Sequence, residues 1–157
     1  MKRKKYILQI IAIFILFSLW ACKKIVAADE AKIKAPVRVY VVTARIDKKG
    51  TNSNSEGTAV LKGTYDEDTK KISYSIEYSN VTPQLIALRS GTKGSAGTLV
   101  RELFKKNNEQ EAPAAVTGSF LLNPLQERNL LKGLWFVAIN TANMTPEISG
   151  VLTLKQQ

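Results

Sequence analysis

The stretch Lys71–Val81, KISYSIEYSNV, decides the fold of this chain of 157 residues. From Ile72 to Tyr78, isoleucine or tyrosine occupies every second position, and serine or glutamate fills the positions between them. A strict period of two gives a strand one buried face and one solvated face, as in an antiparallel sheet. The stretch therefore predicts an antiparallel strand with Ile76 on its buried face.

Segments rich in β-branched residues lie on both sides of this stretch and are separated by polar turn formers. They predict further strands at Val37–Ile46, Thr58–Tyr65, Gln84–Arg89, Thr98–Phe104, Val116–Leu122, Leu134–Asn140 and Glu147–Leu154. One helix is predicted over Pro124–Lys132, because Asn123 can cap it, Pro124 suits its first position and Gly133 can end it. About eight strands and one short helix predict an all-β, antiparallel β-sandwich or barrel.

The N-terminal residues have the pattern of an export signal. Residues 2–5 are all lysine or arginine, and Tyr6–Leu19 is an uncharged, mostly apolar run. This run has the length of a signal peptide core, about 7–15 residues, and is shorter than the roughly 20 that span a bilayer. It closes on a sequence that resembles a lipobox, formed by Leu19, Trp20, Ala21 and Cys22. We expect a lipoprotein signal peptide at residues 1–21 and acyl chains on Cys22. The alternatives are an uncleaved membrane anchor and a plain secretory signal.

Beyond the signal, the sequence predicts a flexible tether over residues 22–36 and a β domain over residues 37–157. The tether mixes alanine, lysine and acidic residues without a clear period, as flexible linkers do. Such a chain is anchored in a bacterial membrane through its lipid and faces away from the cytoplasm. Lys23 follows the cysteine, and the absence of aspartate there favours the outer membrane over the inner one.

The net charge of +10 does not indicate a nucleic-acid partner. The chain has 23 Lys and Arg against 13 Asp and Glu, and four of the cations belong to the signal at residues 2–5. The excess charge is therefore concentrated at the N-terminus. No array of basic and aromatic residues that could stack on bases is apparent in the remainder. We expect no nucleic-acid binding.

The absence of histidine removes whole classes of chemistry from this chain. Neither a Ser-His-Asp nor a Cys-His arrangement can form, and the single cysteine, Cys22, is expected to be acylated. We expect no catalytic residues, no metal site and no cofactor. The neighbours Trp135 and Phe136 point to opposite faces of their predicted strand, so both pack in the interior only if both faces are covered. If one is exposed instead, it can bind a sugar ring or a partner protein.

Four blocks of the domain follow one another in an order and spacing typical of one family. They are Gly57–Tyr65 with Ile72–Val81; the glycines Gly91, Gly94 and Gly97; Gly118–Phe120 with Leu130–Gly133; and Phe136–Ala142 with Glu147–Gly150. The blocks resemble the CHRD domain, a chordin-type repeat that also occurs alone in bacterial exported proteins. The resemblance covers Val37–Leu154 and implies an immunoglobulin-like β architecture. Since chordin is a secreted binder of growth-factor ligands, it also implies a binding role.

The chain departs from the family pattern at four polar positions. Where relatives commonly carry two histidines before the glycine loop, this chain has Ala87 and Arg89, and where the late strand carries a histidine it has Asn140. Ser149 stands in place of the arginine of the closing motif. If the histidines bind a metal or a ligand in relatives, those atoms are missing here, although Arg89 and Asn140 can still form hydrogen bonds.

Together these expectations describe a lipid-anchored, exported β domain that acts as a non-enzymatic binding or structural module at the bacterial cell envelope. Its partners are the membrane, through the lipid on Cys22, and an unidentified extracytoplasmic protein or glycan. The candidate ligand-binding residues are Arg89, Asn140, Glu147 and Trp135. The alternative function is a carbohydrate- or envelope-polymer-binding module that uses an exposed aromatic residue.

Overall fold

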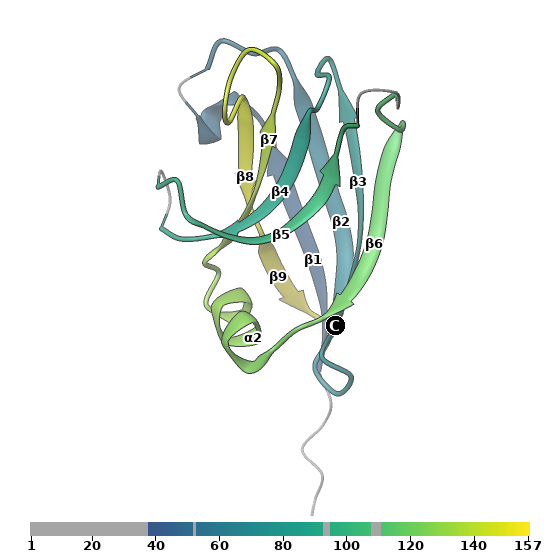
Figure 1. Cartoon of the computed structure of the whole chain (residues 1–157). Coiled ribbons are helices and arrows are strands. Elements are labelled where there is room, and N and C mark those ends of the chain that lie inside the picture. The colour runs from purple at the N-terminus through teal and green to yellow at the C-terminus, as the bar shows by residue number, and fades with distance from the viewer. Residues whose placement is uncertain (1–37, 52, 93–94, 108–110) are drawn as a thin grey trace, which may run out of the picture. The chain divides into compact units, whose positions relative to one another are not determined.

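The alternating stretch forms strand β3, Lys71–Ser79, inside a five-stranded antiparallel sheet (Figure 1). Ile72 and Ile76 are 2% and 0% exposed, while Glu77 and Ser79 face solvent. Tyr74 packs against the same core from the edge of the buried face. The buried and solvated faces predicted from the period of two are confirmed.

Two antiparallel sheets make up the domain, which the computed structural model describes over residues 38–51, 53–92, 95–107 and 111–157. The larger sheet has the order β6-β3-β2-β1-β9 and adds to β3 the strands β1 (Val39–Ile46), β2 (Thr58–Asp66), β6 (Ala115–Leu121) and β9 (Thr153–Gln156). The smaller sheet has the order β5-β4-β7-β8 and consists of β4 (Leu85–Ser90), β5 (Thr98–Lys105), β7 (Trp135–Asn140) and β8 (Ile148–Val151). The prediction of an all-β sandwich or barrel with one short helix is confirmed, and the structure is the sandwich. The predicted signal, lipobox and tether, residues 1–36, lie outside the described residues.

The core lies between the two sheets and contains apolar side chains from both. Its largest fully buried members include Trp135, Tyr65, Ile46, Leu61, Ile76, Ile86, Ile139 and Ile148. Because burial of such side chains is the main favourable term in folding, this interface accounts for most of the stability of the domain. Among the described residues, no helix is long and apolar enough to cross a membrane.

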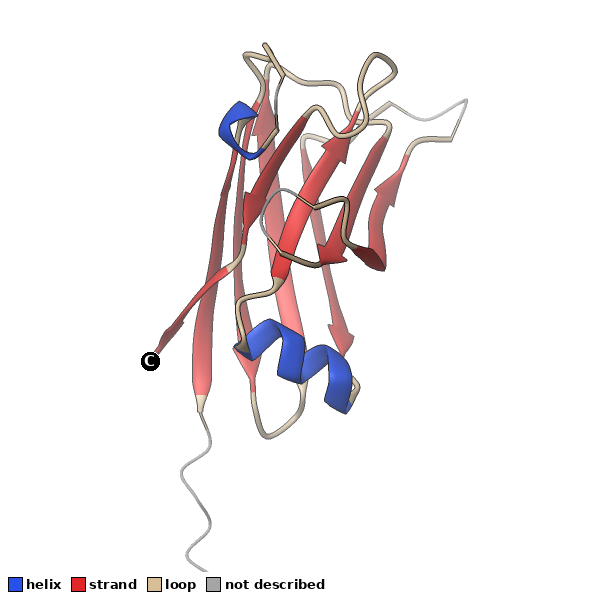
Figure 2. Cartoon of the chain, turned by 90° about the vertical axis from the view of Figure 1, so that its left-hand side faces the viewer, coloured by secondary structure: helices blue, strands red, loops and turns tan. Residues whose placement is uncertain are grey.

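Helix α2, Pro124–Leu131, closes one end of the sandwich between β6 and β7 (Figure 2). Asn123 caps it as predicted: its side chain accepts from the backbone N–H of Gln126 at 2.8 Å, and the Gln126 side chain accepts from the Asn123 N–H at 3.0 Å. Gly133, with φ of +68°, follows the helix. Val39 at the start of β1 lies at this same end. It pairs with Asp66 of β2, Asp66 pairs with Lys71 of β3, and Lys71 pairs with Leu121 at the end of β6, just before α2.

The prediction of one continuous strand over Glu147–Leu154 is wrong, because this segment crosses from one sheet to the other. β8 belongs to the smaller sheet and β9 to the larger, with the buried Leu152 between them. A Cβ atom on Gly150 would lie 2.0 Å from the Arg45 carbonyl oxygen. Glycine therefore lets β8 pass directly against β1 at the sheet edge. The alternation of residue types continues through the crossing, so the pattern does not reveal it.

Candidate functional site

The outer face of the smaller sheet gathers the residues that set this chain apart from its family pattern. Ala87 pairs with Ala138, and Ala138 pairs with Ser149, so these three residues form one row across β4, β7 and β8. Arg89 and Asn140 lie two positions along their strands from this row and therefore share its face. The sequence separates these positions widely, and the strand register brings them to one surface.

Trp135 lies on the opposite, inner face of β7 and is 0% exposed. Its ring stacks on that of Phe120 with centroids 6.5 Å apart. Its Nε1 atom has no hydrogen-bond partner within the described part of the chain. Phe136, on the outer face, is only 9% exposed. Both faces of β7 are covered, so the two rings pack as the first interpretation of this pair expected, and the alternative of an exposed aromatic that stacks on a sugar does not hold here.

The loop between β4 and β5 covers Phe136, and a glycine makes that contact possible. Gly97 has φ of +61°, and a Cβ atom on it would lie 2.8 Å from the Phe136 ring. A Cβ atom on Gly91 would lie 2.9 Å from the Gly97 Cα atom. Gly91 and Gly97 thus allow close backbone packing on the outer face, and Gly97 also adopts the left-handed conformation.

The same loop fixes the guanidinium of Arg89. Its Nε–H donates to the carbonyl of Ala96 at 2.5 Å, and its Nη2 donates to the carbonyl of Gly97 at 3.0 Å. Among the described residues, no carboxylate lies within 4.0 Å of this side chain. The hydrogen bonds use two of its five N–H donors, so three donors and the full positive charge are left for another group.

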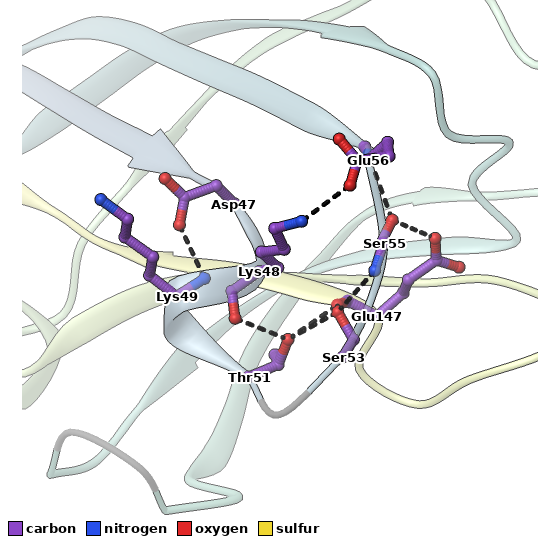
Figure 3. A network of polar contacts seen from close by, with 9 residues as sticks. Asp47, Lys48, Lys49, Thr51, Ser53, Ser55, Glu56 and Glu147 are labelled. Carbon is purple, nitrogen blue, oxygen red and sulfur yellow. Dashed lines mark hydrogen bonds and ion pairs between the residues drawn. The ribbon is translucent and has the colours of Figure 1, made fainter.

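Glu147 anchors the loop between β1 and β2 onto the start of β8 (Figure 3). Its carboxylate accepts hydrogen bonds from the hydroxyls of Ser55 and Thr141. Its backbone carbonyl accepts from Thr51 Oγ1 at 2.7 Å and from Ser53 Oγ at 2.5 Å. The hydrogen bond from Ser55, followed by that from Thr141, lowers the pKa of the Glu147 carboxyl. Glu147 therefore holds loops in place as a carboxylate.

A second contact positions the short 3₁₀ helix η1, Lys48–Gly50, at the edge of the smaller sheet. Asp47 and Ser149 exchange backbone hydrogen bonds of 3.2 Å in both directions. The Ser149 hydroxyl donates to the Gly50 carbonyl at 2.8 Å. Ser149, which stands where relatives carry arginine, is 9% exposed and therefore forms part of this packing.

These loops leave a cleft of about 1140 Å³ on the outer face of the smaller sheet. Arg89, Phe136, Ala138 and Asn140 contribute to its lining from β4 and β7. The remaining lining comes mainly from η1 and its neighbours, the β4–β5 loop, the β7–β8 loop and β8. Of the sequence-predicted residues, Arg89, Asn140 and Trp135 line the cleft, but the Trp135 side chain is 0% exposed and packs in the core. The Glu147 carboxylate does not line the cleft and is bound by Ser55 and Thr141.

The ionisable groups that line this cleft, within the described residues, are three cations and one carboxylate. They are Arg45, Lys49, Arg89 and Asp47. Asp47 is already engaged, because its Oδ2 accepts from Arg45 Nε at 3.2 Å and its Oδ1 accepts from the Lys49 backbone N–H at 2.9 Å. The cleft is therefore a positively charged surface with two cations, Lys49 and Arg89, that no nearby carboxylate neutralises.

Sequence reasoning missed the contribution of Asp47–Thr51 to the cleft. These residues belong to a predicted polar loop, and their composition of charged residues and turn formers is the same as that of any solvated loop. The one usable signal was Ser149, because a change in the closing motif indicates a changed neighbour. In the described residues, no group of three or more His, Cys, Asp or Glu side chains is placed to hold a metal ion.

The fold and its cleft define a two-sheet β-sandwich domain with a cationic cleft on the outer face of the smaller sheet. The chain belongs to the CHRD domain family, whose model matches residues 42–152. The resemblance drawn from the four sequence blocks is thereby confirmed. No curated protein and no solved structure matches the chain.

Proposed function

We propose that this chain is a lipid-anchored, non-enzymatic binding module of the bacterial cell envelope, with the cleft as its ligand-binding surface. The observation that carries the proposal is the cleft itself: it is concave, and two of its cations have no carboxylate partner within the described residues. The carbonyls of Ala96 and Gly97 hold the Arg89 guanidinium in place and leave three of its N–H donors available to a ligand.

The position of the cleft supports its display from an anchor. The chain enters the domain at Val39, at the α2 end of β1, and η1 follows the other end of the same strand. The eight residues of β1 separate these ends by roughly 25 Å at about 3.3 Å per residue. The start of β1 and the η1 side of the cleft therefore lie at opposite ends of this strand.

The anchor is tested by Cys22→Ser. We expect loss of metabolic labelling with an alkyne fatty acid, because the lipobox cysteine provides the sulfur that is acylated. Unchanged labelling of Cys22→Ser would refute the lipid anchor.

The binding role is tested by blocking the cleft with Ala96→Trp. Ala96 is exposed on the β4–β5 loop and lines the cleft, so the indole occupies part of the cleft beside Arg89 without disturbing the core. The matched control is Ala114→Trp, an exposed position before β6 that does not line the cleft. We expect the purified domain, residues 36–157, and its Ala114→Trp variant to co-sediment with isolated envelope fragments, and Ala96→Trp to remain in solution. Equal behaviour of the three proteins would contradict a role of the cleft in binding.

A further inference from the structure

We infer that the cleft binds an acidic saccharide whose carboxylate pairs with Arg89, an assignment that rests on the proposed binding function. The charge of the cleft favours an anionic ligand. Asp47 is the only carboxylate among the described lining residues, and Arg45 and the Lys49 backbone already engage it. The cleft therefore attracts anions and disfavours cations. Arg89 and Lys49 are the charges available to an anionic ligand.

Arg89 is preorganised to bind a carboxylate. The carbonyls of Ala96 and Gly97 hold its planar guanidinium in one position before any ligand arrives. A ligand that binds it therefore does not have to order a long, flexible side chain. Guanidinium is suited to two parallel hydrogen bonds with a carboxylate, and such charged pairs are among the strongest hydrogen bonds in proteins.

The walls of the cleft carry hydroxyl groups. They belong to Thr51, Thr92, Ser95, Thr145 and Ser149. Three of them donate their hydrogen to backbone carbonyls: Thr51 to Glu147, Ser95 to Thr92, and Ser149 to Gly50. The Ser95 oxygen, on an exposed residue, can accordingly accept from a ligand, as can the hydroxyls of the exposed Thr92 and Thr145, and a ligand with several hydroxyl donors satisfies them. The side-chain amide of Asn140 has no hydrogen-bond partner among the described residues, so it offers a ligand both a donor and an acceptor.

The size of the cleft and the apolar part of its surface also suit a saccharide. Small-molecule sites usually have volumes of roughly 300–1,000 Å³. At about 1140 Å³ the cleft has room for more than one sugar ring. Met144 and Val151, 42% and 41% exposed, line the cleft and supply apolar contacts for the C–H face of a ring. An acidic saccharide combines the anion, the hydroxyl donors and the apolar face. An acidic peptide supplies the anion without the hydroxyl groups.

The test uses two disaccharides that differ by one carboxylate-bearing group. The acidic probe is N-acetylglucosaminyl-N-acetylmuramic acid, and the neutral probe is diacetylchitobiose, which lacks the lactyl group. A second acidic probe, digalacturonic acid, covers the uronic acids. We expect the domain, residues 36–157, to bind at least one acidic probe at least tenfold more tightly than the neutral one in an NMR titration, with the largest shift changes around Arg89 and Gly97.

Two variants identify the charges that act. Arg89→Gln should weaken binding of the acidic probe about tenfold or more while binding of the neutral probe stays unchanged. Lys49→Gln, at an exposed position that cannot disturb the core, should weaken acidic binding about threefold. The matched controls are Arg128→Gln and Lys132→Gln, which remove the same charges at the α2 end and should change nothing.

The inference is overturned if acidic and neutral probes bind equally, if no probe binds, or if Arg128→Gln weakens binding as much as Arg89→Gln. Tighter binding of a poly-glutamate peptide than of either acidic saccharide would assign the cleft to an acidic protein instead. In each of these cases the loss of envelope binding by Ala96→Trp still tests the binding function separately, so the two failures can be distinguished.

Discussion

The two faces of β7 are both buried, but different parts of the chain bury them. On the inner face, Trp135, Val137 and Ile139 pack against the larger sheet and are 0% exposed. On the outer face, Phe136 lies under Gly97 and is 9% exposed, and Ala138 lines the cleft and is 3% exposed. The inner face is thus closed by regular strand packing, and the outer face by loop residues whose positions depend on individual hydrogen bonds.

Within the six residues of β7, the inner side chains therefore serve stability and the outer ones border the candidate site. The inner side chains are large and fill the space between two rigid sheets, so a substitution there leaves a void or a buried charge. The outer side chains include small ones, and the loops that surround them leave the cleft open. Loops held by a few polar contacts can differ between relatives without loss of the core. Strand β7 thus supports a fixed core on one face and a variable site on the other.

The largest loss of stability is expected from a substitution on the inner face. Val137→Asp places a carboxylate at a position that is 0% exposed among apolar neighbours, and it should destabilise the domain by more than about 4 kcal/mol. Ile76→Asp, equally buried in the facing sheet, should behave in the same way. Urea denaturation followed by tryptophan fluorescence measures the effect, since Trp135 lies in this core.

The matched control is the next residue, Ala138→Asp. Ala138 is 3% exposed but lines the cleft, so the longer aspartate side chain can extend into the cleft and reach water, and the loss should be less than half of that in Val137→Asp. Equal losses at the two positions would show that the outer face is as tightly closed as the inner one, and the distinction between the faces would fail.

The fold was predictable from the sequence because the larger sheet obeys simple rules. The alternation in β3, the cap at Asn123 and the glycine after α2 each produced the expected local structure. The crossing between β8 and β9 was not predictable, because it depends on how closely Gly150 approaches the Arg45 backbone. A contact between residues so distant in sequence leaves no periodic signal in either segment.

The second prediction concerns the loop that covers the outer face. Gly97→Ala should destabilise the domain by about 2–3 kcal/mol, because alanine is strained at φ of +61° and its Cβ atom would contact the Phe136 ring. Gly133→Ala is the matched control: its φ is +68°, but nothing lies within 4 Å of the new Cβ atom. It should cost only about 1–2 kcal/mol. Thermal unfolding of both variants checks the difference, and equal shifts in Tm would mean that the loop does not rest on Phe136.

The candidate site was less predictable than the fold, and its residues show why. Arg89 and Asn140 could be selected because they replace family residues, but their shared surface depends on the pairing of β4 with β7. Trp135 was misjudged because the apolar run of β7 does not reveal which face a sheet covers and which face loops cover. Lys49 carried no signal at all, since only the folded position of η1 brings it to the cleft.

The smallest expected effect concerns Glu147, which fastens the loops behind the cleft. Because hydrogen bonds from Ser55 and Thr141 lower its pKa, its carboxylate stabilises the folded state fully above the ordinary carboxyl pKa of about 4.3. This contribution is lost as the pH falls through the lower pKa of the folded state. Glu147→Gln should therefore reduce stability at pH 7 by no more than about 1 kcal/mol, since the group is partly solvated.

The difference between wild type and Glu147→Gln should vanish in acid, where both side chains are neutral. Glu127→Gln is the matched control at the α2 end, because hydrogen bonds from Lys70 and Tyr65 lower the pKa of Glu127 in the same sense. It should show the same pH dependence of stability, yet leave amide hydrogen exchange around the cleft unchanged. Glu147→Gln should speed exchange in the β1–β2 and β7–β8 loops. Faster exchange in those loops in both variants would mean that Glu147 does not hold the outer face separately from the core.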